Sequence, residues 1–438
     1  MPAAVPDPAS SPQLTSPLQV ADYRLFWLTR FCSMLATTAM AVVLGWQVYD
    51  IARADYGMAS GQAAFQLGLI GLVQFVPMFV LAPFAGLIAD RMDRRKVGAF
   101  AVAVDFVMAL ALALLTQAGS LNLPLLFALG SLHGVARAFF GPALSAIVSN
   151  ILPAHLVPKA VSLNSLAMQI GMVAGPALGG FLYATGPAVP YWFAVVLLAI
   201  ATIALLAIKP FAMPALPTNV HPLRQIAAGF SYIRRERLLL GCVTLDLFAV
   251  LLAGATALLP VYARDILTVG GHAVGPAGLG VMRAAPAVGA VVVAIVLSFR
   301  PIARNVGVKM LWAVVIFGAA TIVFGLSRNY ALSLGALAVL GAADMVSVFV
   351  RGSLVQLNTP DEMRGRISSI SGLAISASNE LGEMQSGLAA ALLGATGAVV
   401  FGGVGAIIIT GTWAWLFPEL RRSRTFAPQF RSPKEQAT

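Results

Sequence analysis

The chain has 438 residues, of which 59% are hydrophobic and only 10% are charged, and its mean hydropathy is +0.87. Soluble domains carry about 25% charged residues, so a soluble globular protein is excluded at the outset. The net charge of +11 would suggest nucleic acid as a partner in a soluble protein, and in this chain it must first be compared with membrane topology. The two cysteines, Cys32 and Cys242, cannot form a disulfide framework or a four-cysteine zinc site.

Long apolar runs predict membrane-spanning helices. A bilayer core of about 30 Å needs roughly 20 apolar residues per helix, whereas barrel strands alternate over about ten residues. Six runs fall in the first half of the sequence, at 25–50, 66–89, 97–117, 123–148, 161–184 and 190–208. Six more fall in the second half, at 238–262, 274–298, 307–326, 330–356, 367–393 and 395–417. The expected fold class is an all-α integral membrane protein.

The basic residues favour one side of the predicted membrane. Both tails and the loops after even-numbered helices hold 21 of the 28 lysines and arginines, if Lys309 at the start of the ninth run is counted with its loop, and the opposite loops hold only Arg53, Arg264 and Arg328. The positive-inside rule therefore places both termini and the basic loops in the cytoplasm. The net charge is mostly an orientation signal, and nucleic acid is dropped as a partner.

The two halves of the sequence resemble each other. Gly175 to Gly180 aligns with Gly382 to Gly387 at an offset of 207, and Pro77 aligns with Pro286 at an offset of 209. Parallel repeats of six helices predict two pseudo-symmetric bundles around a central cavity, which favours a transporter. The expected domains are a disordered cytoplasmic tail (1–20), an N-terminal six-helix bundle (21–208), a cytoplasmic linker with an amphipathic helix (209–237), a C-terminal six-helix bundle (238–418) and a basic cytoplasmic tail (419–438).

The loop after the second helix carries the strongest motif. Its charged residues follow Gly86, which allows close helix approach, and they can act as a charge latch between the bundles. The latch candidates are Gly86, Asp90, Arg91, Arg94 and Arg95. The loop resembles motif A of the major facilitator superfamily, G-x-L-x-D-R-x-x-R-R-K.

Other segments resemble the same superfamily. Arg137 with Gly141 is similar to motif B, and the fifth helix is similar to motif C, the antiporter signature. In that helix glycines one turn apart admit close contact and the proline favours a kink, so a hinge or seal is predicted at Gly171, Gly175, Pro176, Gly179 and Gly180. The alternative is a stripe that serves packing alone.

A finer resemblance points to one branch of the superfamily. The segments from Asp22 to Trp27, from Ala138 to Ala143 and from Thr359 to Ile367 resemble a branch that includes the enterobactin exporter and related drug efflux proteins. The resemblance covers residues 21–418 and implies proton-driven export of amphipathic metabolites. It also implies a monomer.

Ionisable residues at mid-membrane depth are costly and usually face a cavity or a partner. Arg137 and Asp344 occupy equivalent positions in the repeat, and the resemblance places helices four, seven and ten around the cavity. The proton-coupling candidates are Asp246, Asp344, Glu380 and Glu383. The cavity or substrate candidates are Arg30, Arg137, Arg283 and Gln47. Asp105 is a weaker candidate, because the third helix is expected to pack outside the cavity. The alternative for every acid is a structural ion pair with Arg137 or Arg283.

The predicted function is a secondary active transporter, not an enzyme, that exports a small amphipathic compound across the inner membrane by alternating access. The substrate is expected to be siderophore-like or drug-like, and the proton gradient is the expected energy source, with no cofactor and no metal. A phosphate-binding loop, H-E-x-x-H and G-x-S-x-G are all missing from the sequence. The alternatives are a lysophospholipid or lipid transporter on the same scaffold and a non-transporting membrane sensor.

Overall fold

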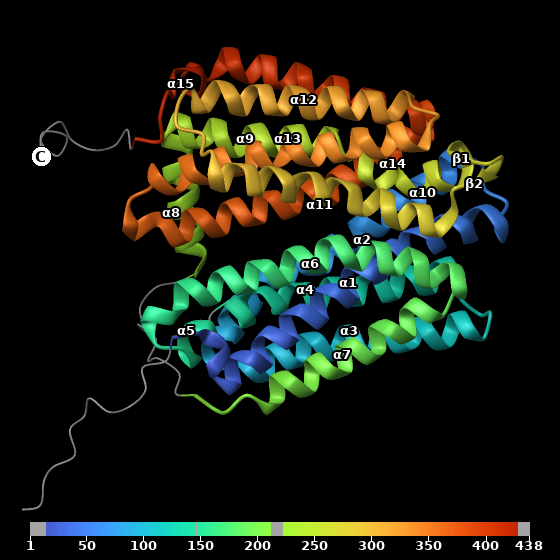
Figure 1. The fold of residues 1–438 in the computed structure, drawn as a ribbon, viewed down its shortest axis with the longest axis horizontal. Helices are drawn as coiled ribbons and strands as arrows, with labels where there is room; N and C mark the ends of the chain where they lie inside the picture. The colour runs from blue at the N-terminus through green and yellow to red at the C-terminus, as the bar shows by residue number, and fades with distance from the viewer. Residues whose placement is uncertain (1–14, 146, 212–221, 428–438) are drawn as a thin grey trace, which may run out of the picture.

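The computed structural model describes residues 15–145, 147–211 and 222–427, and it is almost entirely helical (Figure 1). The first half contains η2 (Pro17–Gln19), α1 (Ala21–Ala54), α2 (Ser60–Arg91), α3 (Arg94–Gln117), α4 (Leu123–Ser145), α5 (Val148–Ile151), η3 (Ala154–Leu156), α6 (Val157–Thr185) and α7 (Val189–Ala207). A connecting helix, α8 (Pro222–Arg235), follows.

The second half begins with the segments α9 (Arg237–Leu252), η4 (Ala255–Leu258), α10 (Leu259–Val261) and η5 (Tyr262–Ile266). A short hairpin of β1 (Thr268–Val269) and β2 (His272–Ala273) comes next. The remaining helices are α11 (Gly275–Phe299), α12 (Val306–Leu326), α13 (Tyr330–Leu357), α14 (Asp361–Leu416) and α15 (Pro418–Arg422).

The expected membrane spans are present. Eleven helical segments of the described chain are long and apolar enough to cross a bilayer, and the last of them covers two crossings. Within α14, Gly394 has a left-handed φ of 71°, so it divides the helix at the boundary predicted between the last two spans. The all-α membrane fold with twelve crossings is confirmed.

The seventh crossing departs from the prediction, because it is not one continuous helix. A regular helix ends at Leu252, a 3-10 turn begins at Ala255, and a π-helical turn covers Tyr262 to Ile266. Gly254 lies at the break, where an added Cβ would approach the Gly382 carbonyl oxygen to 2.6 Å. The break therefore lets the seventh crossing lie directly against the backbone of α14.

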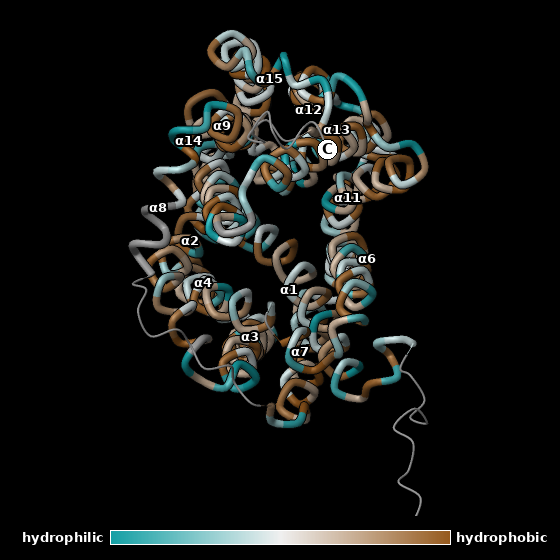
Figure 2. The backbone as a smooth tube through the Cα atoms, turned by 90° about the vertical axis from the view of Figure 1, so that its left-hand side faces the viewer, coloured by the Kyte–Doolittle hydropathy of each residue, from teal (hydrophilic) through white to brown (hydrophobic). Residues whose placement is uncertain are grey.

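The two groups of helices meet along two seams. Figure 2 looks along the helices, with α1, α3, α4 and α7 on one side and α9, α12, α13 and α15 on the other. Between them α2 packs against α14, and α6 packs against α11. We call α1–α7 the N-terminal half and α9–α15 the C-terminal half.

Glycines bring the backbones together at both seams. A Cβ on Gly180 of α6 would lie 2.9 Å from the Cα of Gly280 on α11, and a Cβ on Gly387 of α14 would lie 2.8 Å from the Cα of Gly68 on α2. Gly180 and Gly387 are equivalent in the sequence repeat. The two seams are therefore built alike, and both lie toward the end of the molecule that carries the β-hairpin, which we call the hairpin end (Figure 1).

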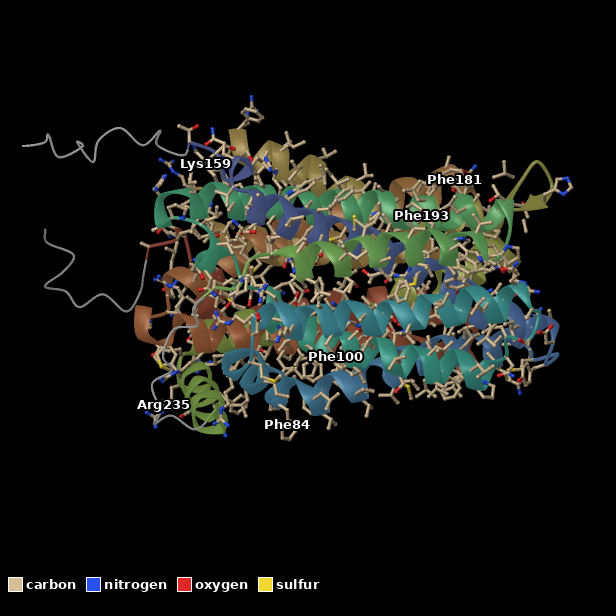
Figure 3. The ribbon with its side chains drawn as sticks, turned by 90° about the horizontal axis from the view of Figure 1, so that it is seen from below. Phe84, Phe100, Lys159, Phe181, Phe193 and Arg235 are labelled. Atoms are coloured by element: carbon tan, nitrogen blue, oxygen red, sulfur yellow. The ribbon has the colours of Figure 1, made fainter. Side chains whose placement is uncertain are left out.

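The opposite end, which we call the basic end, carries the loop between α2 and α3, the helix α8 and α15 (Figure 1). Lys159 and Arg235 lie at this end, whereas Phe84 and Phe100 project from the apolar flank of the bundle (Figure 3). The connecting helix α8 packs on α9 and α14 through Ile233, which is buried against Leu239 and Ile367.

Candidate functional site

The central cavity lies between the two halves and has a volume of about 410 Å³. Its walls come from α1, α2, α3 and α4 of the N-terminal half and from η4, α10, α11 and α14 of the C-terminal half. Volumes of about 300–1,000 Å³ are typical of small-molecule sites. The charged residues on its walls are Asp105, Arg137, Arg283, Glu380 and Glu383, and His133 lies among them.

An ion pair crosses the cavity from one half to the other. Arg137 of α4 donates through Nη1 to the Oε1 atom of Glu380 on α14. The Glu380 side chain is buried, whereas Arg137 keeps about a third of its surface exposed toward the cavity. The pair therefore ties the N-terminal half to the C-terminal half at the place where a ligand would lie.

Glu383 lies one helical turn from Glu380 and lines the same cavity as Arg283. Its side chain packs against α2, where a Cβ on Gly71 would lie 3.0 Å from the Glu383 Oε2 atom. The absence of a side chain on Gly71 leaves room for this carboxyl group at the seam. The structure thus brings Arg137, Arg283, Glu380 and Glu383 together around one cavity.

Asp246 and Asp344 lie elsewhere, so the expectation that they share a cavity with Arg137 is wrong. Asp246 of α9 forms an ion pair with Arg351 of α13, and both are nearly buried. This pair lines a second pocket of about 350 Å³ within the C-terminal half, which has no wall residue in common with the central cavity. Asp344 faces a narrow gap among α9, α12 and α13.

Gln47 is a structural residue, and its prediction as a cavity residue is wrong. It is 4% exposed, accepts a hydrogen bond from the Tyr191 hydroxyl at 2.6 Å and donates to Thr116 Oγ1 at 3.4 Å. These contacts join α1, α7 and α3 inside the N-terminal half. A glutamine in an apolar helix has the same sequence appearance whether its partners belong to the protein or to a ligand.

Arg30 lies beside the cavity and not on its wall. Its Nε atom donates to Asn164 Oδ1 at 3.0 Å, and its guanidinium lies 5.4 Å from the centre of the Phe140 ring. Phe140 itself lines the cavity. Arg30 therefore positions the aromatic wall through a cation–π contact.

The expectation for Asp105 is also wrong, because it lines the cavity although α3 was expected to pack outside it. Its Oδ1 atom lies 2.7 Å from Nδ1 of His133 on α4. His133 was not among the predicted site residues. The available signal was a histidine four residues before Arg137 in an apolar helix, which places both side chains on one face.

The motif C glycines form a two-sided contact. Added Cβ atoms on Gly171, Gly175 and Gly179 would collide with Met34, Thr38 and Ala39 of α1, while Gly180 faces α11. The α6 helix remains continuous through Pro176. This geometry is that of close packing at the hairpin end.

The motif A loop is fixed within the N-terminal half. Asp93 caps α3 by accepting from the Arg95 backbone N–H at 3.0 Å, and Arg95 binds the Asp93 carboxylate at 2.6 Å and the Ile208 carbonyl oxygen. Hydrogen bonding to Arg95 lowers the pKa of Asp93 below its ordinary value of 3.8. Gly86 has open space beside it, Arg91 is exposed, and Arg94 donates to the Ala89 carbonyl oxygen at 3.3 Å. Asp90 belongs to α2, and its side chain lies outside the described part of the structure.

The hairpin end is joined by polar contacts between α1 and η5. Asp50 binds Arg264 at 2.9 Å, and Asp265 accepts a hydrogen bond from the Tyr49 hydroxyl at 2.5 Å. Arg53 lies 3.6 Å from Asp265. These pairs join the N-terminal half to the C-terminal half at the hairpin end.

Two pseudo-symmetric six-helix halves that enclose a central cavity define a transporter of the major facilitator superfamily. The family model described as transmembrane secretion effector matches residues 12–432, and the chain belongs to this family. The enterobactin exporter EntS of Shigella flexneri is 27% identical over 379 residues, which cover 86% of this chain and 85% of that protein. The enterobactin exporter EntS of Citrobacter koseri is 28% identical over 381 residues, which cover 86% of each chain.

Solved structures share the fold at low sequence identity. A POT family transporter in complex with 5-aminolevulinic acid superposes with a TM-score of 0.72 at 13% identity, covering 92% of this chain and 97% of that chain. A bacterial homologue of the human lysosomal transporter Spinster, in an inward-facing and unoccupied conformation, superposes with a TM-score of 0.65 at 14% identity, with the same coverage. The predicted superfamily is confirmed, and so is its resemblance to the enterobactin exporter.

Proposed function

We propose that this membrane transporter exports a small amphipathic compound, siderophore-like in its chemistry, in exchange for protons. The observation that carries the proposal is the Arg137–Glu380 pair, which joins the two halves across the central cavity. The names of the curated relatives support export and a siderophore-like substrate.

The chemistry follows from the cost of charge in a dry interior. When the halves move apart, Arg137 and Glu380 must separate, and an isolated buried carboxylate is unfavourable. A proton that binds Glu380 removes this cost and allows the movement, and a proton on the neighbouring Glu383 removes the repulsion between the two carboxylates. Loss of the proton on the other side of the membrane restores the pair and resets the transporter.

The direction of transport and the orientation of the protein in the membrane are part of the same proposal. The lysines and arginines gathered at the basic end favour a cytoplasmic location for that end and for both termini. The hairpin end, which is closed by the two seams and the crossed ion pairs, then faces away from the cytoplasm. This arrangement corresponds to a state that takes up substrate from the cytoplasmic side.

The substrate can be found by comparing cells that carry the transporter with cells that lack it. Metabolites are profiled inside the cells and in the medium, and the exported compound should accumulate inside the cells that lack the protein. Unchanged profiles would contradict export.

The coupling is then tested in inverted membrane vesicles with the compound so found. An acidified lumen should drive its uptake, and Glu380→Gln and Glu383→Gln should each lower the proton-driven rate at least about tenfold, equivalent to about 1.4 kcal/mol. Glu419→Gln is the matched control, because Glu419 pairs with Arg237 at the basic end, away from the cavity. Full proton-driven uptake by both amide variants would contradict proton exchange through these acids.

A further inference from the structure

The Asp105–His133 pair stands apart from the residues used so far. It lies wholly within the N-terminal half, between α3 and α4, and both side chains reach the wall of the central cavity. The side chains are 8% and 15% exposed. A carboxylate so deeply buried requires a partner, and His133 supplies it.

The contact determines which ring nitrogen is available. An ionised Asp105 carboxylate accepts a hydrogen bond from Nδ1 of His133, and Nε2 of the neutral ring then retains its lone pair. Within the described residues, Nε2 has no hydrogen-bond partner from the protein. The free nitrogen of this cavity-lining histidine can therefore accept a proton from cavity water.

The charges around the cavity favour that proton. The elements that face His133 contribute two arginines and three acids, so with all three acids ionised and the imidazole neutral the cavity walls carry a net charge of −1. The cation on the same helix is Arg137, α11 contributes Arg283, and the acids are Asp105 of α3 and Glu380 and Glu383 of α14. From α1 and α2 come only uncharged polar groups, namely Ser33, Thr37, Thr38 and Gln74. One proton on Nε2 brings the net charge of the walls to zero.

We propose that His133 Nε2 is a second proton-binding site, located in the N-terminal half and positioned by Asp105. A proton from cavity water binds the Nε2 lone pair and gives an imidazolium, whose charge the Asp105 carboxylate balances. The same proton returns to water when the cavity opens on the other side. This inference rests on the proposed proton exchange, and it adds one titrating site in the half opposite to Glu380 and Glu383.

Nuclear magnetic resonance of the full-length protein with ¹⁵N-labelled histidine tests the site directly. Substituting His155, His221 and His272 with glutamine leaves His133 as the only signal; His155 and His272 are exposed, and His221 lies outside the described residues. We expect the Nδ1–H tautomer at pH 8 and conversion to imidazolium as the pH falls to 5. A ring that stays neutral over this range, or that shows the Nε2–H tautomer, would overturn the proposal.

Asp105→Asn distinguishes positioning from packing. The amide can still fill the space and accept a hydrogen bond through its oxygen, but it cannot balance an imidazolium. We therefore expect a smaller fraction of imidazolium at His133 in this variant than in the unmodified protein at the same pH. An unchanged His133 titration would overturn the assigned role of Asp105.

The transport readout separates this inference from the proposed function. His133→Gln should lower proton-driven uptake at least about tenfold, whereas His272→Gln should leave it unchanged. If His133 titrates but a proton gradient drives no uptake in the unmodified protein, the proposed function fails and the proton site stands. If uptake is proton-driven and His133→Gln leaves it unchanged, the inference fails and the proposed function stands.

Discussion

The two ends of the interface between the halves are built differently. At the hairpin end, glycines bring α2 onto α14 and α6 onto α11, and crossed ion pairs join α1 to η5. At the basic end, the contacts that the described residues show for Asp93 and Arg95 of motif A lie within their own half, and the connecting helix α8 packs on the C-terminal half. Closure at one end thus depends on shape and charge between the halves, while the other end is fixed mainly within each half.

Gly387→Leu should have the largest effect, because it prevents the close contact between α2 and α14 at the hairpin end. The new side chain would begin 2.8 Å from the Cα of Gly68, where only backbone atoms stand and little can give way. Overpacking of this kind costs about 1–3 kcal/mol, so transport should fall about 5- to 150-fold. Hydrogen exchange at the connection between α1 and α2 should become faster, because the hairpin end can no longer close.

Gly335→Leu is the matched control for this glycine. It lies within α13, and no atom stands within 4 Å of an added Cβ. Transport and exchange should remain as in the unmodified protein. Equal effects of the two substitutions would show that helix propensity, and not the seam, determines the result.

Removing charge at the hairpin end should have a smaller effect. Asp50→Asn removes the ion pair with Arg264. The side chain of Asp50 is 37% exposed and that of Arg264 is 24% exposed. Partly exposed pairs contribute about 0.2–1 kcal/mol, so the closed state should lose less than about fivefold in population. Hydrogen exchange at the hairpin end should show this shift at low salt and lose it in 1 M salt.

The exchanged pair, Asp50→Arg with Arg264→Asp, should restore closure. It keeps both charges and reverses their positions. If hydrogen exchange at the hairpin end stays fast in the double variant, Asp50 acts through a contact other than the pair with Arg264.

Asp93→Asn should have the smallest effect and should leave the hairpin end unchanged. Because the folded-state pKa of Asp93 is lowered, its contribution to stability is present above its ordinary pKa of 3.8 and is lost as the pH falls through the lowered value. At pH 7 the variant should melt slightly lower, by less than about 1 kcal/mol in unfolding free energy.

Thermal melting at pH 7 and at pH 3 checks this expectation. The difference between the variant and the unmodified protein should shrink at the lower pH, where the native carboxylate begins to bind a proton. Asp55→Asn, at an exposed position of the hairpin end, is the control. A difference that grows with acidity would contradict the assigned sign.

Periodicity along the chain predicted the crossings well because each depends on a continuous apolar run. It failed at the seventh crossing, where the run continues through Gly254 but the backbone does not remain helical. The turn at Gly394 was predictable because glycine separates two runs there.

Partners of buried charges were much harder to predict. Glu380 forms an ion pair with Arg137 of the other half, and Asp246 forms an ion pair with Arg351 on another helix of its own half. The separation of two residues in the sequence does not indicate whether their side chains form an ion pair. Gln47 shows the opposite error: it was predicted to face the cavity, but its amide forms hydrogen bonds within the protein core. The Asp105–His133 pair was within reach, because each residue interrupts an apolar helix.

One consequence concerns the thiols of this protein. Both cysteines are buried, Cys32 in α1 at 3% exposure and Cys242 in α9 with no exposed surface. Reagents that attack accessible thiolates should therefore leave the native chain unmodified. Spin labels or fluorophores placed on new cysteines in the two halves can then report their separation in the unaltered background of the natural sequence.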